Sequence, residues 1–169
     1  MTSQIRVDSI VPTTGVPTGG GGGIVQCVQD VLTSTVTVTS TSFTDVGLSA
    51  TITPLSSSSK ILVIADIASS GSNQFFTLFQ LVRGSTNIYL GTDSKTYVAS
   101  KVYYPASDNV QDGSSISNTN MFFLDSPATT SPVTYKIQVR VNGNSAVING
   151  RTDDDTCLAS SLTLMEVSA

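Results

Sequence analysis

Hydrophobic and polar residues alternate most strictly over residues 133–141, where five apolar side chains lie on one side and Thr, Lys, Gln and Arg on the other. This period of two predicts a β-strand with one buried face. Asn142-Gly143-Asn144 follows as a tight turn into a segment over residues 146–149, whose first three residues are apolar and whose last, Asn149, begins a second Asn-Gly pair. We therefore expect the two segments to form a β-hairpin.

Short apolar stretches recur along the rest of the chain, and turn residues such as the serine run 56–59 and Gly84 separate them. They predict further strands at 24–32, 35–39, 48–53, 61–69, 75–82, 87–91, 96–104, 115–124 and 158–167. No segment has a helical period. The pattern predicts an all-β fold, an antiparallel β-sandwich that is jelly-roll-like, over residues 24–169.

Residues 61–65 and 75–81 are apolar at both odd and even positions. A strand of a sandwich with one solvated face should be apolar on one side only, so something must cover the second side. Phe75, Phe76 and Phe79 are therefore candidates for a subunit interface, because an exposed apolar sheet face is an aggregation hazard. The alternative is a central strand that loops of the same chain cover.

The segment before residue 24 differs from the rest of the chain. Apolar residues alternate there with Pro12, Gly15 and Pro17, which favours an extended arm that has no core of its own. Five glycines follow and leave the backbone almost unrestricted. We expect residues 1–23 to be an anchoring arm that ends in a hinge, made of Gly19, Gly20, Gly21, Gly22 and Gly23.

Composition removes several classes of function. Charged residues make up 12% of the 169 residues, the net charge is −4, and Ser and Thr together number 49. The eight Lys and Arg residues are scattered, so we expect no nucleic-acid partner. No apolar run approaches 18 residues and no signal peptide is recognisable, so we expect no membrane partner and synthesis in the cytoplasm. Cys27 and Cys157 have no metal-ligand spacing, which favours buried free thiols over a disulfide or a metal site.

The chain contains no histidine, which rules out Ser-His-Asp and Cys-His catalysis and the common zinc ligand sets. The glycine run lacks the Gly-Lys-Ser/Thr sequence that a phosphate-binding loop needs. Asp153-Asp154-Asp155 favours a solvated loop tip over a Ca²⁺ site. We expect no cofactor, no metal and no enzymatic activity. Tyr97, Tyr103 and Tyr104 are typical either of a carbohydrate-binding platform or, more often, of aromatic packing.

Several motifs resemble those of a known family. They are the opening Ile5-Arg6-Val7-Asp8-Ser9-Ile10, the glycine-rich link, residues 43–54, Ser58-Ser59-Lys60-Ile61-Leu62-Val63, and residues 81–86. Together they are similar to tail-fibre-like and virion structural proteins of tailed bacteriophages, especially phages of aquatic bacteria. The resemblance implies a homotrimer localised in the virion, with the N-terminal segment attached to other virion proteins of the tail, the baseplate or the capsid.

On this resemblance, the arm would anchor through its apolar residues Ile5, Val7, Ile10, Val11 and Val16. A short trimeric fibre would then contact a host surface glycan through Tyr103, Tyr104, Asp108 and Asn109. The alternative is a capsid decoration protein whose arm threads between coat subunits, because no repeats or shaft lie between arm and domain. An enzyme that acts on surface glycans is a third and weaker hypothesis.

Overall fold

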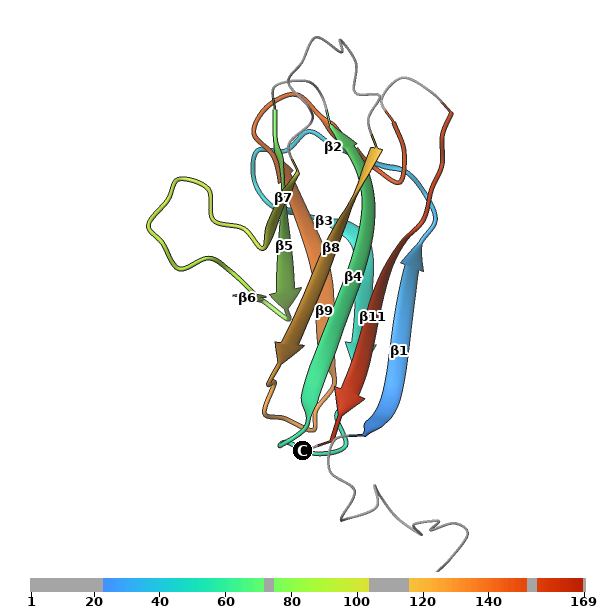
Figure 1. The fold of residues 1–169 in the computed structure, drawn as a ribbon, viewed down its shortest axis with the longest axis vertical. Helices are drawn as coiled ribbons and strands as arrows, with labels where there is room; N and C mark the ends of the chain where they lie inside the picture. The colour runs from blue at the N-terminus through green and yellow to red at the C-terminus, as the bar shows by residue number, and fades with distance from the viewer. Residues whose placement is uncertain (1–22, 72–74, 104–115, 152–154, 169) are drawn as a thin grey trace, which may run out of the picture.

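The computed structural model describes residues 23–71, 75–103, 116–151 and 155–168, and this part of the chain is all-β (Figure 1). Its strands are β1 (Ile24–Leu32), β2 (Val36–Val38), β3 (Thr44–Ile52), β4 (Lys60–Gly71), β5 (Thr77–Arg83), β6 (Thr86–Ile88), β7 (Lys101–Tyr103), β8 (Ile116–Asp125), β9 (Val133–Val141), β10 (Ala146–Ile148) and β11 (Ser160–Val167). These residues include no helix of the length and apolarity that crossing a membrane requires.

The strands form two antiparallel sheets that pack face to face. Sheet A has the order β1-β11-β4-β8, and β10 and β2 continue it beside the last residues of β4, from Ser69 to Gly71. Sheet B has the order β3-β9-β5, and β7 and β6 pair with the first and last parts of β5. The fold is therefore a β-sandwich, as the sequence predicts.

The alternating residues of the strands fill the space between the sheets. Tyr135, Ile137 and Val139 of β9 are fully buried, and so are Ile61 and Val63 of β4 in the opposite sheet. Burial of an aliphatic side chain of this size stabilises the fold by about 1.5–3 kcal/mol. The period of two in the sequence thus corresponds directly to the inner faces of the two sheets.

Every predicted strand overlaps an observed one, and the predicted ranges 24–32 and 133–141 match β1 and β9 at both ends. The predicted hairpin between β9 and β10 is wrong. β9 pairs with β3 and β5 in sheet B, whereas β10 pairs with β4 and β2 in sheet A. Gly143 and Asn144 do have positive φ angles, so the turn exists, but the chain uses it to cross between the sheets. Turn residues determine where the backbone bends and not which strand receives the next segment.

The two strands that are apolar at every position differ in their outer faces. Residues 77–82 of β5 are all buried, and residues of the chain itself contact the outer side of this sheet. The ring of Tyr97 lies 5.5 Å from the guanidinium carbon of Arg140, which pairs across the sheet with Leu78. In β4, by contrast, Leu62 and Ile64 on the outer side are only half-buried.

Both cysteines are free, as expected, but neither is buried. Cys27 lies on the outer side of β1, where its partner in the pairing is Met165. Cys157 lies just before β11, and its thiol donates a hydrogen bond to the carbonyl oxygen of Thr33 over 3.2 Å. The prediction of buried thiols fails because both positions fall outside the apolar interface between the sheets.

Candidate functional site at the loop end of the sandwich

The two ends of the sandwich have different structures. At one end, here called the arm end, Gly23 leads into β1 and Ser168 follows β11 (Figure 1). The amide of Ser168 donates to the carbonyl oxygen of Gly23 over 3.0 Å, and the amide of Gly23 donates to Ser168 Oγ over 3.2 Å. At the opposite end, here called the loop end, lie the described connecting residues 33–35, 39–43, 142–145, 149–151 and 155–159.

The predicted arm falls almost entirely outside the described residues. Its anchoring side chains and the glycines from Gly19 to Gly22 are among residues 1–22. Of the predicted hinge only Gly23 is described, and it is exposed, with no atom within 4 Å of the position that a Cβ would take. The described domain begins as a strand at the next residue, so the glycine run leads directly into β1.

A polar network organises the arm end around Glu166 of β11, whose side chain is buried. Its Oε1 accepts a hydrogen bond from the amide of Leu55 over 2.9 Å, and its Oε2 accepts one from Gln26. Burial by itself would raise the pKa of Glu166, but hydrogen bonds from Gln26, Ser59, Leu55 and Ser56 outweigh burial and lower it. The charged carboxylate therefore ties β1, β11 and the 53–59 loop together.

A second network joins the two sheets near the same end. Arg83 of β5 donates to both carboxylate oxygens of Asp125, over 2.9 and 2.7 Å, and the carboxylate belongs to β8 of the other sheet. The hydroxyl of Tyr135 donates to Asp125 Oδ2 over 2.7 Å. Paired ionised groups of this kind are favourable only when their hydrogen bonds are satisfied, as they are here. Hydrogen bonds and an ion pair between side chains thus hold the two sheets together at the arm end.

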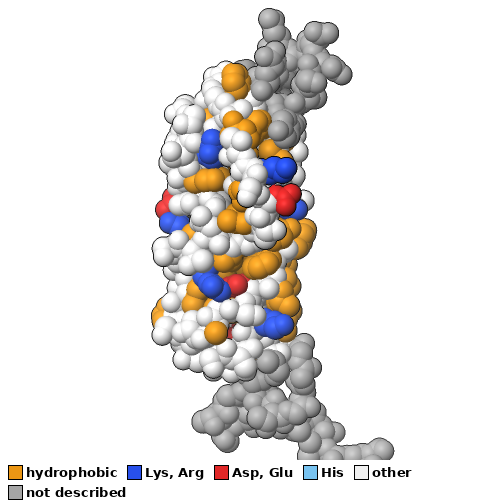
Figure 2. Space-filling view, turned by 90° about the vertical axis from the view of Figure 1, so that its left-hand side faces the viewer, with side chains coloured by type: hydrophobic (Ala, Val, Ile, Leu, Met, Phe, Trp, Pro, Cys, Tyr) orange, Lys and Arg blue, Asp and Glu red, His pale blue; other side chains and the backbone are white. Residues whose placement is uncertain are grey.

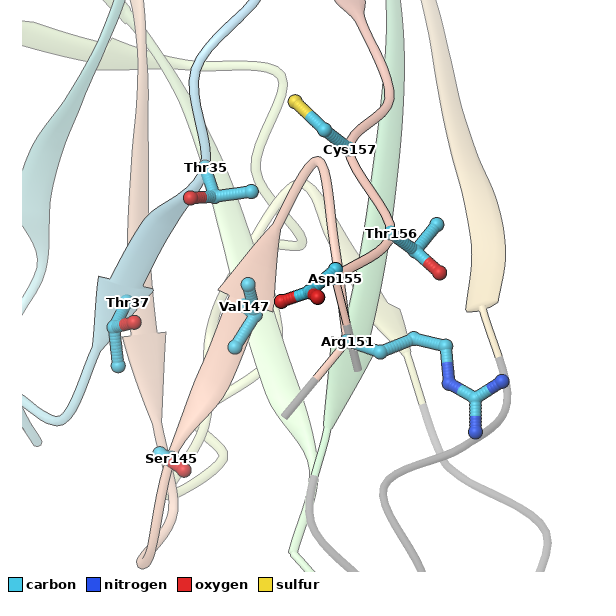
Figure 3. A pocket seen from close by; sticks show the side chains of 8 residues that line it. All are labelled: Thr35, Thr37, Ser145, Val147, Arg151, Asp155, Thr156 and Cys157. Carbon is cyan, nitrogen blue, oxygen red and sulfur yellow. The ribbon is translucent and has the colours of Figure 1, made fainter. Parts of the chain in front are cut away.

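The loop end carries a pocket of about 490 Å³ between β2, β10 and the segment that precedes β11 (Figure 3). Hydroxyl, carboxylate and guanidinium groups dominate its lining, which consists of Thr35, Thr37, Ser145, Val147, Arg151, Asp155, Thr156 and Cys157. In Figure 3 the Asp155 carboxylate points toward Val147, while the Arg151 side chain extends in the opposite direction. Such a lining can donate and accept hydrogen bonds with a polyhydroxylated ligand.

The pocket residues were not predicted as a site. Two of them drew attention in the sequence for other reasons, Asp155 as part of an acidic run and Cys157 as a free thiol, and Asp153 and Asp154 lie outside the described residues. Within the described ranges, no three His, Cys, Asp or Glu side chains gather in a way that could hold a metal ion. Thr35 and Thr37 come from β2 and its approach, more than a hundred residues before Asp155, so no local pattern could have joined them.

The predicted host-contact residues are only partly described. Tyr104, Asp108 and Asn109 lie outside the described residues. Tyr103 ends β7, packs against the core, and is half-buried, and this burial raises the pKa of its hydroxyl. Tyr97 packs edge-on against Phe76 with 4.8 Å between ring centroids, and its hydroxyl donates to Asn142. Its ring therefore serves aromatic packing, the more common alternative.

The predicted interface phenylalanines occupy three different environments. Phe79 is fully buried in the core between the sheets, so its side chain cannot contact another subunit. Phe76 is also buried, and it packs against Tyr97. Phe75 is partly exposed at the loop end. Of the three, only Phe75 presents a surface to a partner, because Phe76 and Phe79 are buried within the same chain.

Comparison with protein-family models gives no match for this chain, and comparison with curated proteins gives no similar sequence.

Proposed function

We propose that this protein is a non-enzymatic structural protein of a bacteriophage virion, a short trimeric fibre that attaches through its N-terminal arm and presents its sandwich to the host surface. The observation that carries the proposal is the difference between the two ends of the domain. The glycine run enters at the arm end, while the polar pocket lies at the opposite end. A tethered domain with this arrangement displays its pocket away from the surface that the arm grips.

The strand order supports a finer fold assignment, a jelly roll. The long strands alternate between the sheets, with β3, β5 and β9 in sheet B and β1, β4, β8 and β11 in sheet A. The short strands β2, β6, β7 and β10 bring the sheets to six and five strands, and four strands lie side by side across each sheet. Eight-stranded double sheets of this kind occur in viral capsid proteins and in lectins. The fold agrees with a particle component that contacts glycans, although fold alone does not define function.

Capsid decoration is the second candidate, and the short connection favours it. β1 begins at Ile24, directly after the last glycine, so no shaft separates the domain from the surface that holds the arm. A decoration protein would sit flat on the coat at a local three-fold axis with its arm between coat subunits. The number of copies per particle distinguishes the two roles: a tail fibre should be present in tens of copies, and hundreds would favour decoration.

The decisive experiment removes residues 1–18 from the recombinant protein and keeps the glycines. We expect the truncated domain to keep its circular dichroism spectrum and melting temperature and to lose binding to particles that lack the protein. The full chain, added in parallel, is the control that must bind. Binding by the truncated domain, or loss of its fold, would refute the anchoring role of the arm.

The glycan contact is tested at the pocket. Thr37→Val keeps the shape of the side chain and removes a hydroxyl that lines the pocket, while Thr51→Val makes the same change on exposed β3 of sheet B. We expect only the first to weaken retention of the protein on immobilised host polysaccharide. Release of new reducing ends from that polysaccharide would instead support the enzyme hypothesis.

A further inference from the structure

The outer faces of the two sheets are chemically different. On sheet B, Asp45 of β3 pairs with Lys136 of β9 over 2.8 Å, and Gln138 donates to the same carboxylate, so the part of this face that β3 and β9 form is charged and solvated, while residues of the chain itself cover β5. On sheet A, the strand register places apolar side chains beside one another in two adjacent rows. They are Cys27, Met165, Leu62 and Leu124 in the first row and Ile64 and Phe122 in the second, and they are called the apolar face below. Thr163 and Gln29 complete the second row on the β11 and β1 side, and they are polar and uncharged.

The apolar face includes two of the large hydrophobic side chains that the structure leaves exposed. Phe122 is 63% exposed and Leu124 is 48% exposed, and both lie in the second half of β8. Since a phenylalanine side chain buries roughly 150–250 Å² when covered, Phe122 alone leaves on the order of 100–150 Å² uncovered. Apolar patches of a few hundred Å² mark interaction sites. Figure 2, which views the left-hand side of Figure 1, shows hydrophobic side chains interspersed with polar ones and recurring along the right-hand outline of the molecule, the side on which sheet A lies.

The strand that carries Phe122 and Leu124 adds a second reason for a partner. β8 pairs only with β4, so among the described residues its other side has no strand partner over its ten residues. Neither lysine nor proline interrupts β8, and these are the usual residues that protect an edge strand from association. A monomer would therefore expose an apolar face beside a strand that has only one strand partner among the described residues.

We propose that the apolar face is the surface through which three copies of this chain associate, with their sheets A turned toward a common axis. A four-stranded sheet is about 19 Å wide at about 4.8 Å per strand. Three such faces enclose a triangular prism whose sides lie about 5.5 Å from the axis, close to half of the ~10 Å that separates packed sheets. The width of sheet A thus suits a three-fold core.

Charge and polarity fit a second copy of the same chain. The two apolar rows contain no charged side chain, so identical faces can meet at the same height without like charges in contact. Lys60 and Asp66 lie beyond the rows at either margin of β4, and Gln29 and Asn120 extend the polar rim. An apolar centre with a polar rim is the anatomy of protein interfaces, which bury about 800 Å² on each partner.

The choice of three copies rests on the proposed function, because a parallel three-fold arrangement brings the three arm ends to one side. A two-fold, antiparallel arrangement would instead place Lys60 opposite Asp66 of the partner and would send the arms to opposite sides. Sedimentation equilibrium of the full chain at micromolar concentration separates these arrangements by mass, and we expect three copies.

The test of the surface uses matched double variants. Phe122→Thr with Leu124→Thr removes two exposed apolar side chains from the apolar face, and threonine retains the preference for a strand. Leu55→Thr with Val102→Thr removes two that are exposed to nearly the same extent, 60% and 47%, outside sheet A. We expect the first pair to yield a folded monomer with an unchanged circular dichroism spectrum and the second pair to remain a trimer.

The reactivity of the two free cysteines reports whether the apolar face is covered while the protein remains assembled. Cys27 lies on the apolar face and Cys157 lies at the loop end, and both are exposed in the single chain. For each thiol, the rate of maleimide labelling in the native full-length protein is divided by its rate in denaturant. We expect this ratio to be at least tenfold higher for Cys157 than for Cys27. In the Phe122→Thr, Leu124→Thr variant the labelling of Cys27 should rise at least tenfold, while that of Cys157 should stay unchanged.

The outcomes separate this inference from the function on which it rests. A trimer that survives the Phe122 and Leu124 changes, with Cys27 still protected, overturns the apolar face as the interface and leaves the trimeric fibre intact. A wild-type monomer or dimer overturns both. A third outcome is that both the full chain and the chain without residues 1–18 are monomers, and that Cys27 reacts with maleimide faster in the shortened chain. The arm would then cover this face, and the inference would be wrong.

Discussion

Tyr135 provides the sharpest test of how the two sheets are held together. Its ring is fully buried, and its hydroxyl donates over 2.7 Å to Asp125, so the bond runs from β9 in one sheet to β8 in the other. Burial first, and then the hydrogen bond to Asp125, raise the pKa of Tyr135 above its usual value of 10.0. The hydroxyl is therefore protonated at neutral pH and acts as the donor.

The substitution Tyr135→Phe removes this donor and keeps the ring. Arg83 still donates to Asp125, so the carboxylate retains a partner, and the expected cost is that of one buried hydrogen bond to a charged group, about 1.5–3 kcal/mol. In a domain of this size each kcal/mol lowers the melting temperature by about 2–4 °C. We therefore expect a fall of about 3–12 °C and a lower urea midpoint with an unchanged m-value.

Tyr97→Phe is the matched control, because the hydroxyl of Tyr97 donates to Asn142 over the same 2.7 Å but in an exposed position and to a neutral acceptor. We expect this control to cost less than about 0.5 kcal/mol. Since the chain has no tryptophan, circular dichroism at one protein concentration is the suitable probe of urea and thermal unfolding. If the two substitutions cost the same, the buried bond does not hold the sheets together and the reasoning fails.

Three further predictions concern the arm end, a crossover turn and the thiols. The lowered pKa of Glu166 contributes stability above its ordinary value of 4.5 that is lost as the pH falls through the folded pKa. Glu166→Gln should thus cost about 1–3 kcal/mol at pH 6 and clearly less at pH 3 in urea titrations, whereas an equal cost at both values would contradict the assignment. Gly143→Ala should destabilise the fold by more than about 1 kcal/mol, because φ is +135° and a Cβ would lie 2.5 Å from the Phe75 ring. Gly91→Ala, with open space around it, is its control and should be neutral in the same melts. Thiol titration of the unfolded, unreduced protein should find two thiols per chain, and a count of zero would reveal a disulfide.

Much of the fold could be predicted because the signal is local. The alternation over residues 133–141 gives both ends of β9 and its buried face, and residues 24–32 do the same for β1. The doubly apolar runs in β4 and β5 indicated that outer faces need a cover, but they could not say which cover. The outer side of β5 is covered by the same chain, whereas Phe122 beside β4 is exposed. Both outcomes depend on neighbouring segments that no local sequence pattern specifies.

The sites were less predictable for the same reason. The pocket combines Thr37 with Asp155, and the arm end combines Gln26 with Glu166, residues that only strand pairing brings together. Asn142-Gly143 predicted a bend, yet the direction of the chain after it depends on whether sheet A or sheet B offers a free edge. Such choices are made by the whole chain and not by the turn.

The sequence by itself determined the strands, their inner faces and the glycine-rich approach to Ile24, because strand formation and chain flexibility depend on neighbouring residues. Only the tertiary structure decided the strand order, the separation of an arm end from a loop end, and the contrast between a charged sheet B and an apolar sheet A. Hydrogen bonds between strands such as β1 and β11 join residues more than a hundred positions apart. Their register is fixed by packing between the sheets, and that packing exists only in the folded chain.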